Sequence, residues 1–132
     1  MPVLCFRSNI SLPEPQRKEL LREATRVVSR LLRSEGCRVM ASWVHCDMLL
    51  DGSDDPAVYA EVQSIFPIDD RACRDLCAAV FDIVNRYATM ESSRVYLYLP
   101  VVNSRAAWKF VNGQPVSPGS PLTPERADHH DN

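Results

Sequence analysis

The second residue of the chain could do chemistry of its own. Pro2 directly follows the initiator methionine, and a small second residue favours removal of Met1, so we expect the mature chain to begin with Pro2. An ordinary α-amino group titrates near ~7.7–8.0, and burial in an apolar site would lower that pKa. A neutral amine near pH ~7 can act as a general base. Alternatively, Pro2 only starts a strand, where its missing N–H costs nothing.

Other reactive side chains form weaker patterns. His45 falls in an expected strand, where a histidine is packed or solvated, and His129 and His130 are adjacent, which alone makes a weak metal site. The sequence holds no phosphate loop, nucleophile elbow or nucleotide fingerprint. We therefore expect neither a metal nor a cofactor. The cysteines lack Cys-x-x-Cys spacing, so we expect free thiols in packing positions and a reducing compartment: Cys5, Cys37, Cys46, Cys73 and Cys77.

Two amphipathic helices are predicted from the spacing of apolar residues. The first repeats from Leu20 to Leu32 at helical spacing, and the second from Cys73 to Tyr87. Ser11 and Glu14 match a capping box before the first helix, which should stop near 34–36, where Gly36 suits a left-handed position. Residues 67–70 should cap the second helix. Four strands are predicted between and around these helices, at residues 2–7, 38–46, 57–66 and 94–99.

The two halves of this pattern superpose at an offset of 56 residues. Leu20 falls on Leu76, and Arg38 falls on Arg94. Agreement of strands and helices at one offset indicates a structural duplication of a β-α-β unit. We predict an α+β two-layer sandwich, in which a four-stranded sheet carries both helices on one face. The other face would stay open and meet another subunit.

Charge and composition limit the class of protein. The chain has 132 residues and a net charge of −2, with 15 Lys and Arg against 17 Asp and Glu. Residues 1–112 carry 14 charges of each sign, so the basic surplus of a nucleic-acid-binding surface is absent. No apolar run approaches the ~20 residues of a membrane span. Residues 108–111 could add a short edge strand, and the proline-rich segment 113–132 should be disordered, leaving residues 1–112 as the domain.

The order and spacing of several features resemble one family. Pro2 is the first residue of the duplicated unit, and a Ser-Asp-Asp-Pro turn precedes the strand that ends at Ser64 and Ile65. Further along the chain, Tyr96 follows Arg94-Val95 at the start of the last long strand, and Trp108 lies close to the C-terminal edge. This arrangement is similar to macrophage migration inhibitory factor and D-dopachrome tautomerase, of the tautomerase superfamily. The resemblance covers residues 2 to about 112.

The resemblance implies a homotrimer whose sheets form a central barrel, with active sites between neighbouring subunits. Pro2 would be the catalytic base that moves a proton between the carbon and oxygen ends of a small aromatic keto–enol acid, such as phenylpyruvate-like or dopachrome-like test substrates. The family needs no cofactor. The remaining pocket positions that match are Ser64, Ile65, Tyr96 from across the interface, Tyr98 in place of an asparagine, Ala106 and Trp108.

One position departs from the family pattern. The family's lysine that binds the substrate carboxylate aligns with Ser34, whose hydroxyl cannot supply the charge, and Glu35 would oppose an anion. Arg38 aligns with an arginine of the D-dopachrome enzyme and can hold a carboxylate bidentately. Arg38, with Arg33, is therefore the candidate anion binder. Alternatively, both arginines are solvated surface residues.

Two functions follow from the resemblance. The first is a keto–enol tautomerase, weakened by the missing lysine. The alternative is a cytokine-like protein with a weak pocket that acts by binding a partner, such as a cell-surface receptor. The first residues do not form a signal peptide, so we expect a cytoplasmic protein, and the family also leaves cells by a non-classical route.

Overall fold

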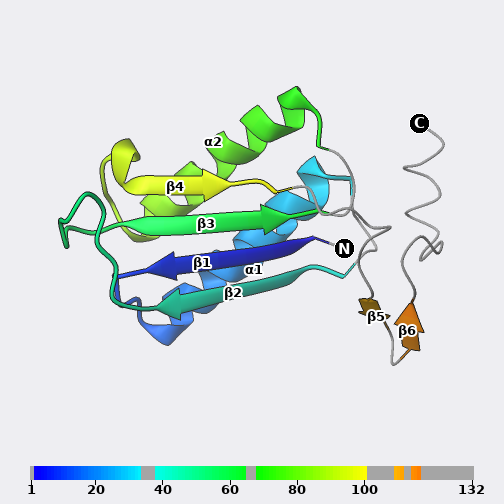
Figure 1. Cartoon of the computed structure of the whole chain (residues 1–132), viewed down its shortest axis with the longest axis horizontal. Helices are drawn as coiled ribbons and strands as arrows, with labels where there is room; N and C mark the ends of the chain where they lie inside the picture. Colours follow the sequence, from blue (N-terminus) through cyan, green and yellow to red (C-terminus); the bar gives the residue numbers. More distant parts are fainter. Residues whose placement is uncertain (1, 34–37, 65–67, 101–108, 112–113, 117–132) are drawn as a thin grey trace.

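Four strands form one mixed sheet in a computed structural model that describes residues 2–33, 38–64, 68–100, 109–111 and 114–116. The strand order is β2-β1-β3-β4, with β1 parallel to β2, β3 parallel to β4, and β1 antiparallel to β3. Each parallel pair is joined through one helix (Figure 1), which makes two β-α-β units. The elements are β1 (Val3–Ser8), α1 (Glu14–Leu31), β2 (Met40–His45), β3 (Val58–Gln63), α2 (Asp70–Tyr87), the 3-10 turn η1 (Ser92–Arg94) and β4 (Val95–Tyr98).

The two units repeat each other in length and position. Both helices have 18 residues, and α2 begins and ends 56 residues after α1. The predicted duplication is thereby confirmed. Leu20 of α1 and Leu76 of α2, which the offset makes equivalent, are both fully buried in one core.

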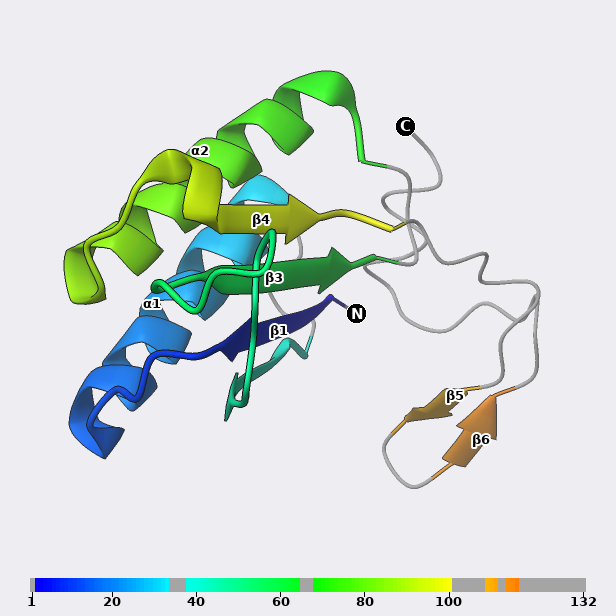
Figure 2. The same ribbon diagram turned by 60° about the vertical axis from the view of Figure 1, so that its left-hand side comes forward.

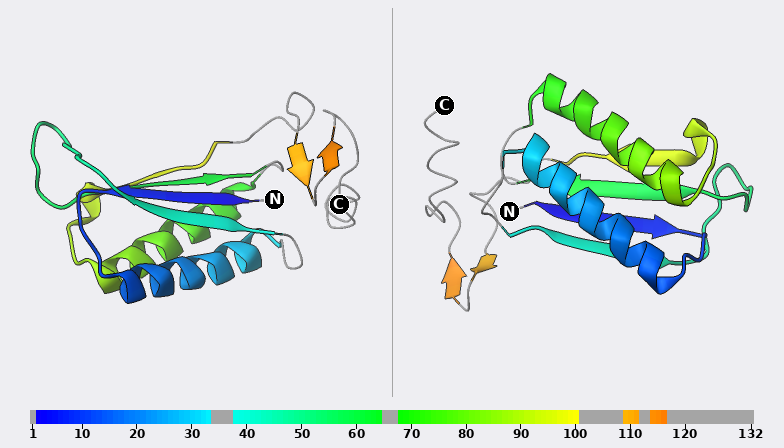
Figure 3. Two further views of the ribbon diagram at one scale, coloured as in Figure 1. Left: turned by 90° about the horizontal axis from the view of Figure 1, so that it is seen from below. Right: turned by 180° about the vertical axis from the view of Figure 1, so that it is seen from behind.

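The core lies between the helices and one face of the sheet. Both helices cover the same face (Figure 3, left), as predicted. Burial alternates along β1 and β3, so Leu4 and Phe6 point toward the helices while Cys5 and Arg7 point away. Figure 2 shows both helices on one side of the sheet, and Figure 1 shows the β2–β3 connection at the end of the strands.

The ends of α1 differ from the prediction. The N-cap is Pro13, with no side-chain cap, so the Ser11–Glu14 capping box is wrong. The backbone of Pro13 is extended, at φ −57° and ψ 147°. Proline is well tolerated in the first turn of a helix, so α1 can start without a side-chain cap. At the other end α1 stops at Leu31, and Arg33 takes the left-handed φ of 52°; Gly36 lies outside the described residues.

The start of α2 confirms the prediction. Asp69 is the N-cap, and its Oδ1 accepts a hydrogen bond from the Ala72 backbone N–H at 2.7 Å. This bond satisfies one of the amide groups that a helix leaves free at its start.

A second, two-stranded sheet follows the domain core. Strand β5 (Lys109–Val111) pairs antiparallel with β6 (Gln114–Val116) rather than with the edge of the main sheet. Residues 114–116 lie within the proline-rich segment 113–132, whose predicted disorder stays a prediction. Within the described residues, no helix is long and apolar enough to cross a membrane.

Trp43 offers a test of packing in β2. Its ring packs against Phe6 at 5.7 Å between centroids, while its buried Nε1 has no hydrogen-bond partner among the residues that the structure describes. An unmet buried donor costs about 1–3 kcal/mol. We expect Trp43→Phe to leave the free energy of unfolding within about 1 kcal/mol of the native value in urea titration, because the lost ring area is offset by removal of the unmet N–H. A loss above about 2 kcal/mol would show that the N–H has a partner in solution.

Candidate active site

Pro2 is buried at the start of the inner strand β1. Its carbonyl accepts a hydrogen bond from the Met40 backbone N–H at 3.3 Å. On the other side, Val3 pairs with Gln63, so the same antiparallel register brings Pro2 opposite Ser64, which is only 5% exposed. The structure thus brings Pro2 and Ser64 together, with Pro2 held between two strands.

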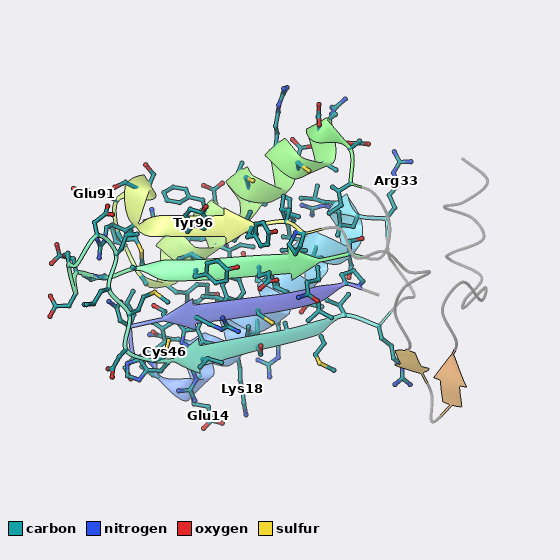
Figure 4. The ribbon with its side chains drawn as sticks, in the orientation of Figure 1. Glu14, Lys18, Arg33, Cys46, Glu91 and Tyr96 are labelled. Atoms are coloured by element: carbon teal, nitrogen blue, oxygen red, sulfur yellow. The ribbon has the colours of Figure 1, made fainter. Side chains whose placement is uncertain are left out.

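Both candidate arginines lie at the Pro2 end of the sheet. Strand β2 runs parallel to β1, so Arg38, two residues before β2, precedes the strand at the end where Pro2 lies. Arg33 follows the last turn of α1 and projects beyond the same end (Figure 4). Both side chains are exposed, and Arg38 makes no hydrogen bond or ion pair within the part of the chain that the structure describes. Arg38 is therefore free to meet an anion.

The duplicated partner of Arg38 has a different role. Arg94 uses its guanidinium to bind backbone carbonyls of the connection between β2 and β3. It donates to the carbonyl oxygens of Leu50 at 3.3 Å, Ser53 at 3.3 Å, Asp55 at 2.6 Å and Pro56 at 3.1 Å. Asn9 holds the same segment, donating to three carbonyls and accepting from the Ala57 N–H at 2.9 Å. The two equivalent arginines thus differ: Arg94 binds backbone carbonyls, whereas Arg38 has no hydrogen-bond or ion-pair partner among the described residues.

Within one chain, the tyrosines of β4 lie far from Pro2. Tyr96 pairs with Tyr59 and Tyr98 with Glu61, both on the face without helices. Tyr59 is five residues from Ser64, so Tyr96 is displaced from Pro2 by about 17 Å along the strand direction at ~3.3 Å per residue. Figure 4 shows Tyr96 on the edge strand β4. The predicted shared face of the two tyrosines is confirmed, but a single chain does not bring them to Pro2.

The remaining predicted pocket residues fall outside the described part of the chain. Ile65, Ala106 and Trp108 cannot be placed relative to Pro2. The candidate site that the structure describes therefore consists of Pro2, Ser64 and the two arginines at one end of the sheet, with the tyrosines of β4 toward the other.

The uncovered sheet face mixes apolar and hydrogen-bonded polar side chains. Met40, Val44, Tyr96 and Tyr98 are all between 47% and 64% exposed. Glu61 accepts hydrogen bonds from the Tyr59 hydroxyl at 3.4 Å and from Gln63 Nε2 at 3.0 Å. Burial raises the pKa of Tyr59, and the Glu61 charge raises it further. The predicted open face is confirmed, and a subunit on it stays a prediction.

The other reactive residues form no site in the described residues. No group of three or more His, Cys, Asp or Glu side chains there could hold a metal ion. Cys73 is half-buried, and burial raises the pKa of its thiol, but Cys77 is exposed, so the prediction that all cysteines pack in the interior is wrong. Residue 77 is equivalent to Leu21, on the rim of the helix stripe, where solvent reaches a small side chain. His45 is exposed at the end of β2.

The structure resembles proteins of one fold. It matches a Leishmania major protein, MIF2, with a TM-score of 0.76 and 18% identity over 88% of this chain and 97% of that one. It matches macrophage migration inhibitory factor of Toxoplasma gondii with a TM-score of 0.73 and 20% identity over 86% and 99%. A third match is Pt0534 inactivated by 2-oxo-3-pentynoate, with a TM-score of 0.67 and 18% identity over 80% and 89%.

Sequence comparison adds no closer relationship. No family model matches the chain, and no curated protein matches it. The structural matches therefore show the fold: this chain has the α+β fold of macrophage migration inhibitory factor, with a four-stranded mixed sheet and two helices, as the resemblance in the sequence predicted.

Proposed function

We propose that this chain, which has the macrophage migration inhibitory factor fold, is a keto–enol tautomerase that uses the amine of Pro2 as its base. The observation that carries the proposal is the position of Pro2. It is buried at the start of an inner strand, beside Ser64 and at the end of the sheet where Arg38 lies. An amine in this place, once Met1 is removed, is shielded from water and lies at the same end of the sheet as Arg38, which has no partner among the described residues.

The proposed reaction moves one proton. The neutral amine of Pro2 takes the proton from the carbon next to the substrate's carbonyl, and the C–H electron pair becomes the C=C bond of the enol. The protonated Pro2 amine then gives up that proton, directly or through water, to the carbonyl oxygen, whose double bond to carbon becomes single. The reverse steps convert enol to keto, and Pro2 ends each cycle neutral. Arg38 holds the carboxylate of the substrate through charge-assisted hydrogen bonds.

The tyrosines enter this proposal from a second copy of the chain. Because Tyr96 lies about 17 Å along the strands from Pro2 of the same chain, its hydroxyl can serve Pro2 only across an interface. The exposed apolar side chains of the open face supply a surface for such contacts. We propose a homotrimer with sites between subunits, in which Tyr96 and Tyr98 donate to the enolate oxygen. A monomer mass in solution at micromolar concentration would contradict this assembly.

The substrate class is a small 2-keto acid with an aromatic body. The similar structure of Pt0534 was inactivated by 2-oxo-3-pentynoate, itself a small 2-keto acid, which supports a pocket of this chemistry in the fold. The tyrosines offer aromatic contact, and Arg38 offers charge.

The test combines mass and activity. Intact mass should show that Met1 is absent, and the native protein should accelerate the enol-to-keto conversion of phenylpyruvate. A chain that retains Met1 has no free Pro2 amine, so activity of that form would contradict the role of Pro2. Removal of Met1 without acceleration would favour the second candidate, a partner-binding protein with a weak pocket, which is motivated by Ser34 in place of the family's lysine.

Arg38→Ala is expected to raise the KM for phenylpyruvate about tenfold or more, with a smaller change in kcat. The physical reason is the loss of a charged hydrogen-bond donor to a carboxylate, worth about 1.5–3 kcal/mol. Arg22→Ala is the matched control, since Arg22 is an exposed arginine of α1 that is paired with Glu19. An unchanged KM in Arg38→Ala would refute its role, and steady-state kinetics of both variants decide the matter.

A further inference from the structure

One exposed face of α1 consists of arginine side chains. Between Leu20 and Leu31, the exposed residues of this helix are Arg22, Arg26 and Arg30, which we call the arginine stripe. Residues four apart lie on one face of a helix, and successive stripe residues are about 6 Å apart along its axis.

The arginine stripe points away from the sheet. Each of its residues stands two positions after a fully buried core residue: Leu20, Ala24 or Val28. Two positions correspond to about 200° around a helix, so the stripe lies on the side of α1 opposite the core. Figure 3, right, views the molecule from this side. The open sheet face, where we place the subunit contacts, is on the other side, so the stripe stays exposed in such an assembly.

The second helix shows that the fold does not require arginine at these positions. The equivalent positions of α2, 56 residues later, are also exposed and hold three residue types: Ala78, Asp82 and Arg86. Several other residues form helices about as well as arginine does. Exposure at these positions is therefore a property of the fold, whereas the uniform positive charge is a property of α1 alone among the two helices.

The charge of the arginine stripe is little compensated. Arg26 and Arg30 make no hydrogen bond or ion pair with any residue of the described ranges. Arg22 lies 3.7 Å from a carboxylate oxygen of Glu19, but both side chains are more than half exposed. An exposed pair of this kind contributes little to stability, so Arg22 can exchange Glu19 for the carboxylate of a partner.

Glu23, which lies between two stripe residues in the sequence, does not neutralise them either. One of its carboxylate oxygens accepts a hydrogen bond from the Tyr87 hydroxyl at 3.1 Å, and the other forms an ion pair with Arg86. Its side chain is only 17% exposed, because it lies toward α2. Glu23 thus joins the two helices and leaves the stripe to solvent.

An apolar hollow borders the stripe. It has a volume of about 440 Å³ and lies between α1 and the start of β2. Leu21, Val39 and Ala41 line it together with two residues of the stripe, Arg22 and Arg26. A hollow of this kind can accept an apolar side chain next to charged groups, as in the grooves that bind amphipathic helices.

These features match an acidic amphipathic helix better than a long polyanion. Carboxylates four residues apart on a helix are also about 6 Å apart along its axis, which is the spacing of the stripe. A long polyanion would also pass the exposed acids Glu14 and Glu19 at the start of α1, and residues 1–112 hold no basic surplus to offset them.

We propose that the arginine stripe binds a helix of a partner protein that presents Asp or Glu at every fourth residue, beside one apolar side chain. Each guanidinium holds one carboxylate through charge-assisted hydrogen bonds, and the apolar side chain enters the hollow. Complementary charges at fixed spacing set the register of such a complex. The stripe contains none of the residues assigned to the Pro2 site, so this inference does not rest on the tautomerase activity proposed above.

The probe is a synthetic helical peptide with this pattern. It is capped at both ends, rich in alanine and about 20 residues long, so that it forms a helix in water. Three glutamates are spaced four residues apart, and one leucine stands three residues after the first of them. Fluorescence anisotropy of the labelled peptide, titrated with the full chain at about 0.01 M salt, should give a Kd below about 1 mM. At about 0.15 M salt the Kd should rise several-fold, because exposed charges are screened.

Two control peptides separate the proposed partner from other anions. Glutamine in place of the three glutamates should raise the Kd about tenfold or more. Three consecutive glutamates keep the charge but lose the common face, so the Kd should rise about threefold or more. Equal binding of the spaced and the consecutive peptide would indicate a surface for polyanions in general and would overturn the proposal.

Variants of the chain locate the site. Arg26→Ala and Arg30→Ala should each raise the Kd about threefold or more, and Arg26→Lys should raise it less. Arg74→Ala, which removes an exposed arginine from α2, is the matched control and should leave the Kd unchanged. Arg26→Glu should abolish binding, and a peptide with lysine at the central glutamate should restore binding to this variant.

Circular dichroism of each variant shows whether it is folded, so a loss of binding can be assigned to the missing charge. An unchanged Kd in both Arg26→Ala and Arg30→Ala, or no binding of the spaced peptide at millimolar concentration, would each overturn the proposal. Neither result depends on the activity at Pro2, which is measured with phenylpyruvate.

Discussion

Pro2→Ala should lower kcat/KM for the enol-to-keto conversion of phenylpyruvate by about 10²–10⁴-fold, the usual contribution of a positioned general base. Alanine at the N-terminus presents a primary amine on a flexible backbone, whereas the proline ring fixes the direction of the nitrogen. The loss should fall mainly on kcat, because Arg38 and the pocket walls still bind the substrate. Steady-state kinetics of native and variant protein measure both constants.

Replacement of Pro2 by alanine should leave the backbone hydrogen bond at this position unchanged. The hydrogen bond of Pro2 uses its carbonyl, which accepts from the Met40 N–H, and alanine keeps that carbonyl. Pro15→Ala is the control, since Pro15 is an exposed proline in the first turn of α1 and its replacement should leave kcat/KM unchanged. Equal rates for Pro2→Ala and native protein would exclude Pro2 as the base.

Leu20→Ala and Leu76→Ala should each lower the free energy of unfolding by about 2–5 kcal/mol. Both side chains are 0% exposed and sit at equivalent positions of the duplicated unit, one on each helix. Truncation removes buried apolar area and leaves a cavity that a close-packed core fills only in part. Urea unfolding followed by circular dichroism gives the values.

Leu49→Ala is the matched control for these two variants. Leu49 has the same side chain but is 66% exposed, so we expect a change of at most about 0.5 kcal/mol. Similar large losses at residues 20 and 76 would show that both halves of the duplication share one cooperative core. A large loss at one position and a negligible loss at the other would contradict that conclusion.

Local sequence patterns were sufficient for most of the fold. The apolar stripes around Leu20 and Leu76 predicted both helices and their equivalence, whereas the alternating burial along β1 and β3 is a finding of the structure. These features depend on the helical and strand periods, which neighbouring residues display directly.

Details of the ends of α1 could not be predicted from the same patterns. Ser11 and Glu14 have capping-box spacing, yet Pro13 is the N-cap, and Arg33 adopts the left-handed backbone expected of Gly36. Several residues near a helix end can satisfy its free amides and carbonyls at similar cost, so the choice depends on how the following chain enters the sheet.

The sequence by itself determined two β-α-β units with a proline at the start of an inner strand. Only the tertiary structure decided which arginine side chains around these units have hydrogen-bond partners. Arg38 and Arg94 are equivalent in sequence, but Arg94 donates to carbonyls 38 to 44 residues away, while Arg38 makes no hydrogen bond or ion pair with the residues that the structure describes. Arg7 lies in one row with Tyr59 and Tyr96 only because the sheet pairs β3 with both β1 and β4. The reason is physical: periodicity is encoded within a few neighbouring residues, whereas a side chain's partners and pockets depend on segments that only folding brings together.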